Sequence, residues 1–547
     1  MRVLPLVMLL ALSARAQTPG SCAIGRASGT LDANDVEVTF PLTGGVAYGP
    51  GLDHAYYVPK DSRLSPLYAA SVWMGGTVEG EFRVAGSTYG QGGVNDDHFE
   101  FWPGPLDPGG TLPDPTDCAE WDRIWVVSVD DVAAYEAGAA PTPDLRDWPV
   151  GLGAGAVEAS GRPVAVTDRR QTLDLAAGQR PVIYGTQTAF WVMNDVGNVH
   201  RTTESVPLGL EVAVTAFEVS SASPALNQSV VMRYRITNRS PRAIEDFRLS
   251  MWADPDLGNA GDDYVGTDTT RSMVYVYNAD EPDDGAYGFR PPAFGVRILG
   301  GQALGGPPRI GASVYFVGSA INFLDPRVAS EYQRIMEGVW RDGTPITARG
   351  TGYEQGGEVT PFVFPGDPTL GQFWSEERRG TGSPKYPNER RFALSTTPFR
   401  LPAGETANVD LAWVFARGDS RLGSVRDLFL SSDTLQTAYA DGSLFATQPR
   451  YVPPPPTPPI LAIDLLAGPN PARERLTLRV RLPRMAPARL SLYDARGRAL
   501  VVTDRAQWPA GQTEVEIPTA SLAPGTYLAR LDVRGGASIT RTITVVR

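Results

Sequence analysis

The densest group of oxygen ligands in the chain is a run of acidic and amide side chains between residues 254 and 268. Its members are Asp254, Asp256, Asn259, Asp262, Asp263 and Asp268. Calcium takes about six to eight oxygen ligands, and carboxylates on one loop can converge on one ion. The run is not an EF-hand, because Val265 stands where that loop needs a glutamate. The pattern predicts a structural calcium site, and the alternative is turn chemistry, which favours the same residue types.

Groups that carry enzymatic chemistry are sparse. The only histidines are His54, His98 and His200, and they lack the spacing of a zinc-binding helix. No Gly-x-Ser-x-Gly elbow or phosphate-binding loop is present. Cys118 lies among aromatic residues without an evident base, which favours burial over nucleophilicity. We therefore assign no catalytic or cofactor-binding residue. A secreted hydrolase that uses a carboxylate pair stays the alternative, because such a pair needs no short spacing.

Two aromatic-rich segments, residues 99–102 and 121–125, have two interpretations. Exposed aromatic rings can stack on sugars and so form a glycan-binding surface. Aromatic residues more often fill cores and the seams between domains. The second interpretation is the commoner one, and the sequence leaves both open.

The two cysteines, Cys22 and Cys118, bear on the compartment of the protein. Cysteines of an exported chain can pair, so either a disulfide or two separate buried thiols is expected. A lipidated Cys22 is not expected, because residues 19–21 lack the aliphatic residue that such a signal needs.

Residues 1–16 have the pattern of a signal peptide. Arg2 supplies the positive charge, residues 3–12 are apolar, and residues 14–16 form a small-x-small cleavage site. The apolar run is too short to span a bilayer. No other segment approaches the length of a transmembrane helix, so we expect export to the periplasm and no span in the mature form.

Composition indicates several β-rich domains. A chain of 547 residues with 58 glycines and 48 prolines is expected to form two to four domains with many turns. Charge is unevenly distributed, because residues 470–547 hold 13 arginines and 6 acidic residues within a chain of net charge −12. The remainder therefore carries −19, and an acidic body excludes nucleic acid as the expected partner.

The body is expected to contain two parts, an N-terminal β-rich domain at 17–205 and a central region at 206–452. Strand and turn patterns across residues 206–318 predict an immunoglobulin-like or fibronectin-like β-sandwich. Helical spacing predicts a helix at 325–340, and a second helix is expected at 424–440. A short helix is predicted at 131–137 with Asp130 as its N-cap. The fold class is thus mainly β, with a few short helices.

A proline-rich spacer at 453–459 separates the body from the last domain, at 460–547. Such a run favours an extended polyproline II conformation, which keeps two bodies apart. After it, residues 476–482 alternate between apolar and polar side chains, as in a half-buried strand. Turn residues recur at short intervals to the C-terminus, so a seven-stranded β-sandwich is predicted.

The motifs of this last domain carry a resemblance. Asn470 and Pro471 precede the first long strand. A middle hairpin contains Tyr493, Asp494 and Gly497, and a turn before the last hairpin contains Leu522, Gly525 and Tyr527. The domain resembles the type A C-terminal sorting domain of the type IX secretion system. The resemblance implies recognition by that machinery and transport across the outer membrane of a Bacteroidetes-like bacterium, followed by release or surface attachment.

The body is similar to a family of large secreted proteins of the same bacteria whose function is uncharacterised. The matching segments are residues 101–107, 191–195, 252–268, 340–345 and 390–392. This similarity implies no activity. The sequence therefore predicts an exported protein at the cell surface or in the medium, whose body is a structural module or binds an extracellular glycan or protein.

Overall fold

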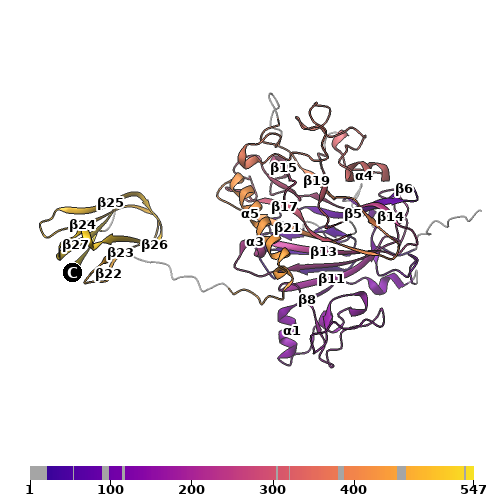
Figure 1. Ribbon diagram of the computed structural model, residues 1–547, viewed down its shortest axis with the longest axis horizontal. Helices are drawn as coiled ribbons and strands as arrows, with labels where there is room; N and C mark the ends of the chain where they lie inside the picture. The colour runs from indigo at the N-terminus through magenta and orange to yellow at the C-terminus, as the bar shows by residue number, and fades with distance from the viewer. Residues whose placement is uncertain are drawn as a thin grey trace, which may run out of the picture. The chain divides into compact units, whose positions relative to one another are not determined.

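The computed structural model describes residues 21–52, 55–88, 98–113, 117–303, 306–318, 321–379, 387–452, 463–534 and 538–547. The expected signal peptide and proline spacer lie outside these residues. The chain divides into two compact units, Met1–Tyr451 and Val452–Arg547, here called unit 1 and unit 2 (Figure 1). In the described part of the chain, no helix combines the length and apolar character needed to cross a membrane.

Unit 1 contains a nine-stranded antiparallel sheet. Its order is β15 (Asp263–Asp268), β16 (Met273–Asn278), β17 (Ala293–Gln302), β21 (Thr406–Ala416), β13 (Ser229–Asn238), β12 (Leu210–Glu218), β11 (Gln187–Asn194) and β7 (Trp102–Pro103), with β8 (Trp125–Ser128) also paired to β11.

A seven-stranded sheet faces it across the main core. Its order is β18 (Ile310–Phe316), β19 (Arg391–Thr396), β14 (Ile244–Asp254), β5 (Ala69–Val78) and β3 (Gly45–Val46), with β20 (Phe399–Leu401) paired to β14 and β6 (Glu81–Ala85) paired to β5. Trp191 and Trp413 of the larger sheet and Trp73 of the smaller one are fully buried in one apolar cluster. Removing these large side chains from water stabilises the contact between the sheets.

The outer face of the nine-stranded sheet is also covered, which explains why its strands read as nearly continuous apolar runs. Helix α5 (Arg421–Ala440) packs on β16, β17 and β21, where Leu428 and Phe429 meet Tyr275 (Figure 1). The loops and short helices after β8 cover β11 and β12, where Trp148 packs beside Phe190. A third layer therefore lies on each end of this sheet.

The helices lie where the sequence predicted them, and one helix begins at a different N-cap residue. Helix α4 (Ala329–Met336) and α5 lie where helices were predicted. Helix α1 (Val129–Glu136) begins two residues earlier than expected, and its N-cap is Ser128 instead of Asp130. The Ser128 hydroxyl accepts from the Asp131 amide, and the Asp131 carboxylate accepts from the Ser128 amide. This reciprocal pair satisfies two amides, which a cap at Asp130 would not do.

The expected boundary between domains at 17–205 and 206–452 is wrong. β5 pairs with β14, and β11 pairs with β12, so strands from both sides of residue 205 share both sheets. Non-local pairing of this kind leaves no composition signal in the sequence. Unit 1 is therefore one body with one main core.

Unit 2 is a sandwich of two antiparallel sheets with seven described strands. One sheet has the order β22 (Asp464–Gly468), β23 (Arg475–Leu482) and β26 (Gly511–Pro518), and the other β25 (Ala499–Trp508), β24 (Ala486–Tyr493), β27 (Gly525–Val533) and β28 (Ser538–Val545). Leu476, Leu478 and Val480 point into its core, as their alternation predicts. Trp508 is fully buried there and donates its indole N–H to the Ala488 carbonyl at 2.8 Å. The mainly β, sandwich-based fold class is confirmed.

Candidate functional site

The first motif of unit 2 joins the beginning of the domain to its last strand. The Asn470 side chain donates to the Thr542 carbonyl at 3.1 Å and accepts from the Thr544 amide at 2.9 Å. Pro471 follows, and Ala472 continues the contact by donating its amide to the Thr544 carbonyl. The amide side chain supplies both a donor and an acceptor, which is why asparagine suits this position.

The middle motif forms the hairpin turn between β24 and β25. The Asp494 carboxylate accepts from the amides of Arg496 and Arg498 at 3.0 and 2.9 Å. These amides, with the Arg498 guanidinium, hold the pKa of Asp494 below its usual value. Gly497 adopts φ of +78°, a conformation that costs other residues energy. Tyr493 ends β24, so the motif residues fix the geometry of the turn.

The third motif leads into β27. Leu522 is buried in the core of unit 2, and Gly525 begins the strand. The Tyr527 ring is buried, and its hydroxyl donates to the Ala523 carbonyl at 2.6 Å. The three motifs thus lie at three separate turns and edges, and their side chains serve the domain's own fold.

The outer face of the β23–β26 sheet carries arginine and glutamate side chains in cross-strand pairs. Arg475 lies 3.2 Å from Glu516, and Arg479 lies 2.6 Å from Glu514. These pairs are exposed and each contributes little stability. The arginines of unit 2 outnumber its acids, so the domain presents a charged, basic exterior.

In unit 1, the structure separates the six residues of the predicted calcium site. Asp268 lies at the far end of β15 and pairs with Arg271 at 2.7 Å. Asp254 lies at the end of β14, 3.6 Å from the Arg391 guanidinium. The Asn259 side chain accepts from the Gly261 amide and so caps its own turn.

Asp262 and Asp263 remain together at the start of β15, with Asp256 close enough to raise the pKa of Asp263. Two residues that the run did not include join them. Asn278 donates its side-chain amide to Asp262 Oδ1 at 2.7 Å, and Asp283 raises the pKa of Asp262. Burial is the larger cause for both aspartates, and it brings the pKa of Asp262 to about 6. Among the described residues, no three His, Cys, Asp or Glu side chains are grouped as a metal site.

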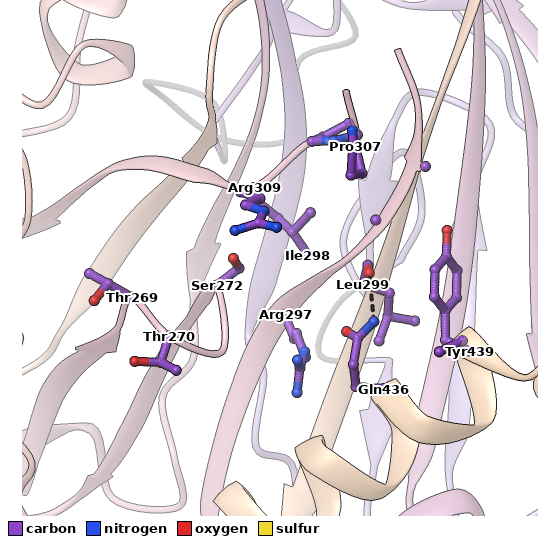
Figure 2. A pocket seen from close by; sticks show the side chains of 14 residues that line it. Thr269, Thr270, Ser272, Arg297, Ile298, Leu299, Pro307, Arg309, Gln436 and Tyr439 are labelled. Atoms are coloured by element: carbon purple, nitrogen blue, oxygen red, sulfur yellow. Dashed lines mark hydrogen bonds between the residues drawn. The ribbon is translucent and has the colours of Figure 1, made fainter. Parts of the chain in front are cut away.

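A cavity of about 430 Å³ lies where the end of β17 meets α5 (Figure 2). Its polar lining includes Thr269, Thr270, Ser272, Arg309, Gln436 and Tyr439. The residues that line it in the described chain include no Asp or Glu. In Figure 2, Arg309 and Ser272 lie on one side of the cavity and the Tyr439 ring lies on the other.

The walls of this cavity are fixed by contacts behind them. The Tyr439 hydroxyl donates to Asp410 at 2.8 Å, and Asp410 also pairs with Arg233. Gly300 has no side chain to displace the Tyr439 ring, which a Cβ there would approach to 3.1 Å. Gln436 donates to the Leu299 carbonyl, as the dashed line in Figure 2 shows. The backbone of β17 is irregular here, between Ile298 and Gly300. Such bulges are common beside binding sites.

Arg309 contributes a positive charge to this cavity. Its guanidinium is exposed, and it forms no ion pair with the described residues. Arg297, also in the lining, points toward α5 and donates to the Ser432 carbonyl and hydroxyl, both at 2.7 Å. The cavity therefore offers hydroxyl groups, an amide, an aromatic ring and positive charge, which are groups that can interact with a polar or anionic molecule.

A second group of charged side chains is fully enclosed. His200 lies 3.7 Å from Glu100, and neither side chain is exposed. Elsewhere in unit 1, Glu376 is buried between Arg379 and Arg390. Because neither side chain is exposed, the histidine and the carboxylate form a buried contact within the fold.

Other sequence expectations are settled by burial. Cys22 and Cys118 form a disulfide, so the alternative of two thiols is wrong. Phe99, Phe101, Trp102 and Trp125 are buried and fill the interior, whereas Trp121 is partly exposed. His54 lies outside the described residues.

Unit 2 is thus a self-contained terminal β-sandwich, and comparison with known proteins identifies it. Residues 468–546 match the family described as the secretion system C-terminal sorting domain. Unit 2 belongs to this family, as its motifs predicted. The chain is accordingly an exported protein, secreted or held at the outer-membrane surface, and its sorting domain implies interaction with the secretion machinery. No curated protein matches the chain.

The solved structures found as similar to the chain have low sequence identity and low TM-scores. A polysaccharide lyase is 10% identical and has a TM-score of 0.18, with 62% of this chain and 34% of that chain covered. Dimeric latent PorU from Porphyromonas gingivalis is 11% identical and has a TM-score of 0.14, with 66% and 32% covered. PorZ, a surface component of the type IX secretion system of that organism, is 11% identical and has a TM-score of 0.13, with 71% and 48% covered. The chain spans about a third of the length of the first two.

Proposed function

We propose that unit 1 is a ligand-binding module, that its ligand is an acidic sugar unit of an extracellular glycan, and that unit 2 delivers this module outside the cell. The observation that carries the proposal is the lining of the cavity between β17 and α5, which holds hydroxyl and guanidinium groups without a carboxylate. Hydroxyl and amide groups match the hydroxyls of a sugar. An exposed guanidinium matches a carboxylate, with which it forms charge-assisted hydrogen bonds.

The volume and rigidity of the cavity agree with this function. At about 430 Å³ it has the size of a small-molecule site. Tyr439 is held by Asp410, and Gln436 by the β17 backbone, so both are preorganised. Binding then costs little side-chain entropy. A glycosidase would need two carboxyl groups beside the sugar, and the described lining supplies none.

Calorimetry on the purified full chain tests the ligand. We expect an oligosaccharide with uronic acid units to bind, and a neutral oligosaccharide of the same length to bind at least about tenfold more weakly. Arg309→Gln should remove this preference, because a hydrogen bond to a charged group contributes about 1.5–3 kcal/mol, or roughly 10-fold to 100-fold in Kd. Arg327→Gln is the matched control, since Arg327 is also exposed but lies outside the lining. Equal binding of both oligosaccharides, or no effect of Arg309→Gln, contradicts the proposal.

Truncation tests delivery separately. Removing residues 460–547 deletes the sorting domain, so we expect unit 1 to accumulate in the periplasm while the full chain reaches the surface or the medium. Fractionation of cells that carry each form measures this. Surface delivery of the truncated chain would refute the role of unit 2 without bearing on the glycan site.

A further inference from the structure

The last residue of β16 and the first residue of β15 place two oxygen atoms in the interior without a hydrogen-bond donor. Asp263 and Asn278 are opposite each other in the β15–β16 register, so their side chains lie on one face of the sheet. Both residues are fully buried. Oδ1 of Asp263 and Oδ1 of Asn278 have no partner among the described residues. A buried acceptor without a donor is costly, so something must satisfy this pair.

The remaining polar atoms of the two side chains are engaged, which fixes their orientation. Asp263 Oδ2 accepts from the Leu257 amide at 3.1 Å. Asn278 Nδ2 donates to Asp262 Oδ1 at 2.7 Å. Rotating the Asn278 amide would place its oxygen against the Asp262 carboxylate, which cannot donate when ionised. The amide oxygen therefore does not exchange places with the N–H₂ group, and it remains without a donor.

The surroundings carry an excess of negative charge. Asp262 and Asp263 are adjacent, and Asp256 and Asp283 act on them electrostatically. Arg390 is the cation that acts on Asp263, and it already pairs with Glu376. Two adjacent carboxylates and an amide oxygen, with one partly exposed member, fit a cation that prefers oxygen ligands. Asp262 is the partly exposed member, so it supplies a path from solvent.

We propose that a calcium-class cation binds at the start of β15, held by Asp263 Oδ1, Asn278 Oδ1 and the Asp262 carboxylate, with water in its remaining positions. This site differs from the one that the sequence predicted. It excludes Asp268, Asn259 and Asp254, and it gains Asn278 from the neighbouring strand. With two carboxylates it also agrees with the lack of any group of three acidic, histidine or cysteine ligands in the described chain.

The competing occupants are a proton shared by Asp263 and Asn278, and a buried water molecule. Asp263→Asn distinguishes them, because the new side chain has nearly the same shape and brings an N–H₂ group. That group can donate to Asn278 Oδ1, so it satisfies the pair if a proton or water normally does so. It removes a charged ligand if a cation does so. Asp268→Asn is the matched control, since Asp268 belongs to the same strand and pairs with Arg271.

The experiment uses the purified full chain after chelation, titrated with CaCl₂ by calorimetry and melted in 1 mM calcium or in chelator. We expect one bound calcium per chain and a Tm about 2 °C higher with calcium. Asp263→Asn should lose both effects, and Asp268→Asn should keep both. If Asp263→Asn does not fold, Asn278→Ala replaces it and should weaken calcium at least tenfold. Absence of calcium binding to the unaltered chain overturns the proposal. Retention of calcium binding by Asp263→Asn overturns it as well, and so does loss of binding in Asp268→Asn.

Discussion

His200 is expected to be charged at neutral pH in the folded protein, because both of its ring nitrogens face carbonyl oxygens. Nδ1 lies 3.0 Å from the Val84 carbonyl, and Nε2 lies 2.7 Å from the Asp195 carbonyl. A carbonyl only accepts, so both nitrogens must donate, and only the imidazolium form does so. Glu100, 3.7 Å away, supplies the opposite charge. Burial by itself lowers the pKa of His200, but the Glu100 and Asp195 carboxylates and the two carbonyls raise it above its usual value.

Replacing His200 by Gln removes the cation and leaves the Glu100 carboxylate buried without its counter-charge. Breaking one side of a buried ion pair costs about 3–5 kcal/mol. With about 2.1 cal/mol/K of unfolding entropy per residue, a unit that extends to Tyr451 shifts its Tm by roughly 1 °C for each kcal/mol. We therefore expect His200→Gln to lower the Tm of unit 1 by about 3–5 °C near pH 6.

The sign of the pH dependence follows from the raised pKa. A histidine whose pKa is higher in the folded state contributes its full stabilisation below the unfolded value, about 6.5, and loses it as the pH rises through the folded pKa. The difference in Tm between the unaltered chain and His200→Gln should thus be largest below about pH 6.5 and shrink in alkaline solution. Calorimetric melts at a series of pH values measure it. His98→Gln is the control, because His98 joins this network through its carbonyl oxygen, which accepts from Thr202.

A direct measurement is also available, since the chain has only three histidines. NMR of a sample with labelled histidine should show one imidazole that stays protonated when the others have titrated. A Tm difference that grows with pH, or a His200 ring that is neutral at pH 6, would refute the reasoning.

Three further predictions concern stability. Glu376→Gln removes the carboxylate that pairs with Arg379 and Arg390, so the free energy of unfolding of unit 1 should fall by about 3–5 kcal/mol in denaturant titrations; no change would show that the cluster is hydrated. Replacing Cys22 and Cys118 together by Ser opens a loop of 96 residues and should cost about 2–5 kcal/mol, measured as the same quantity; an unchanged midpoint would contradict this. Tyr527→Phe removes the hydrogen bond to Ala523 and should destabilise unit 2 by about 0.5–1.5 kcal/mol, while unit 1 keeps its Tm; an effect on unit 1 instead would be inconsistent with two units.

The parts of the fold that the sequence predicted well are those whose signals are local. In unit 2, alternation across residues 476–482 defines the core face of β23, and Asp494 and Gly497 satisfy a turn within five residues. Helix α4 was predicted from the spacing of its own apolar residues. In each case the residues that signal the element also form it.

The domain boundary expected at residue 205 was wrong because the signals that decide it are not local. β5 finds its partner in β14, and β17 finds its partner in β21, each more than 100 residues away in the chain. No local pattern reports such pairing. The sequence also could not show which residues of the predicted calcium site lie together, since a strand rises about 3.3 Å per residue and β15 carries Asp268 away from Asp263. Asn278 belongs to the next strand, and only the strand register shows that it lies opposite Asp263.

The motif residues of unit 2 make their contacts within the domain itself. Asn470, Asp494, Leu522 and Tyr527 are each engaged inside the domain, so these motif residues hold its fold. The described strands of unit 2 pair only with one another, and its core is its own. Folding of unit 2 then does not depend on the body that precedes it. A substitution at a motif residue should weaken delivery in proportion to the stability it removes. The same substitution in a chain with a different body should have the same effect.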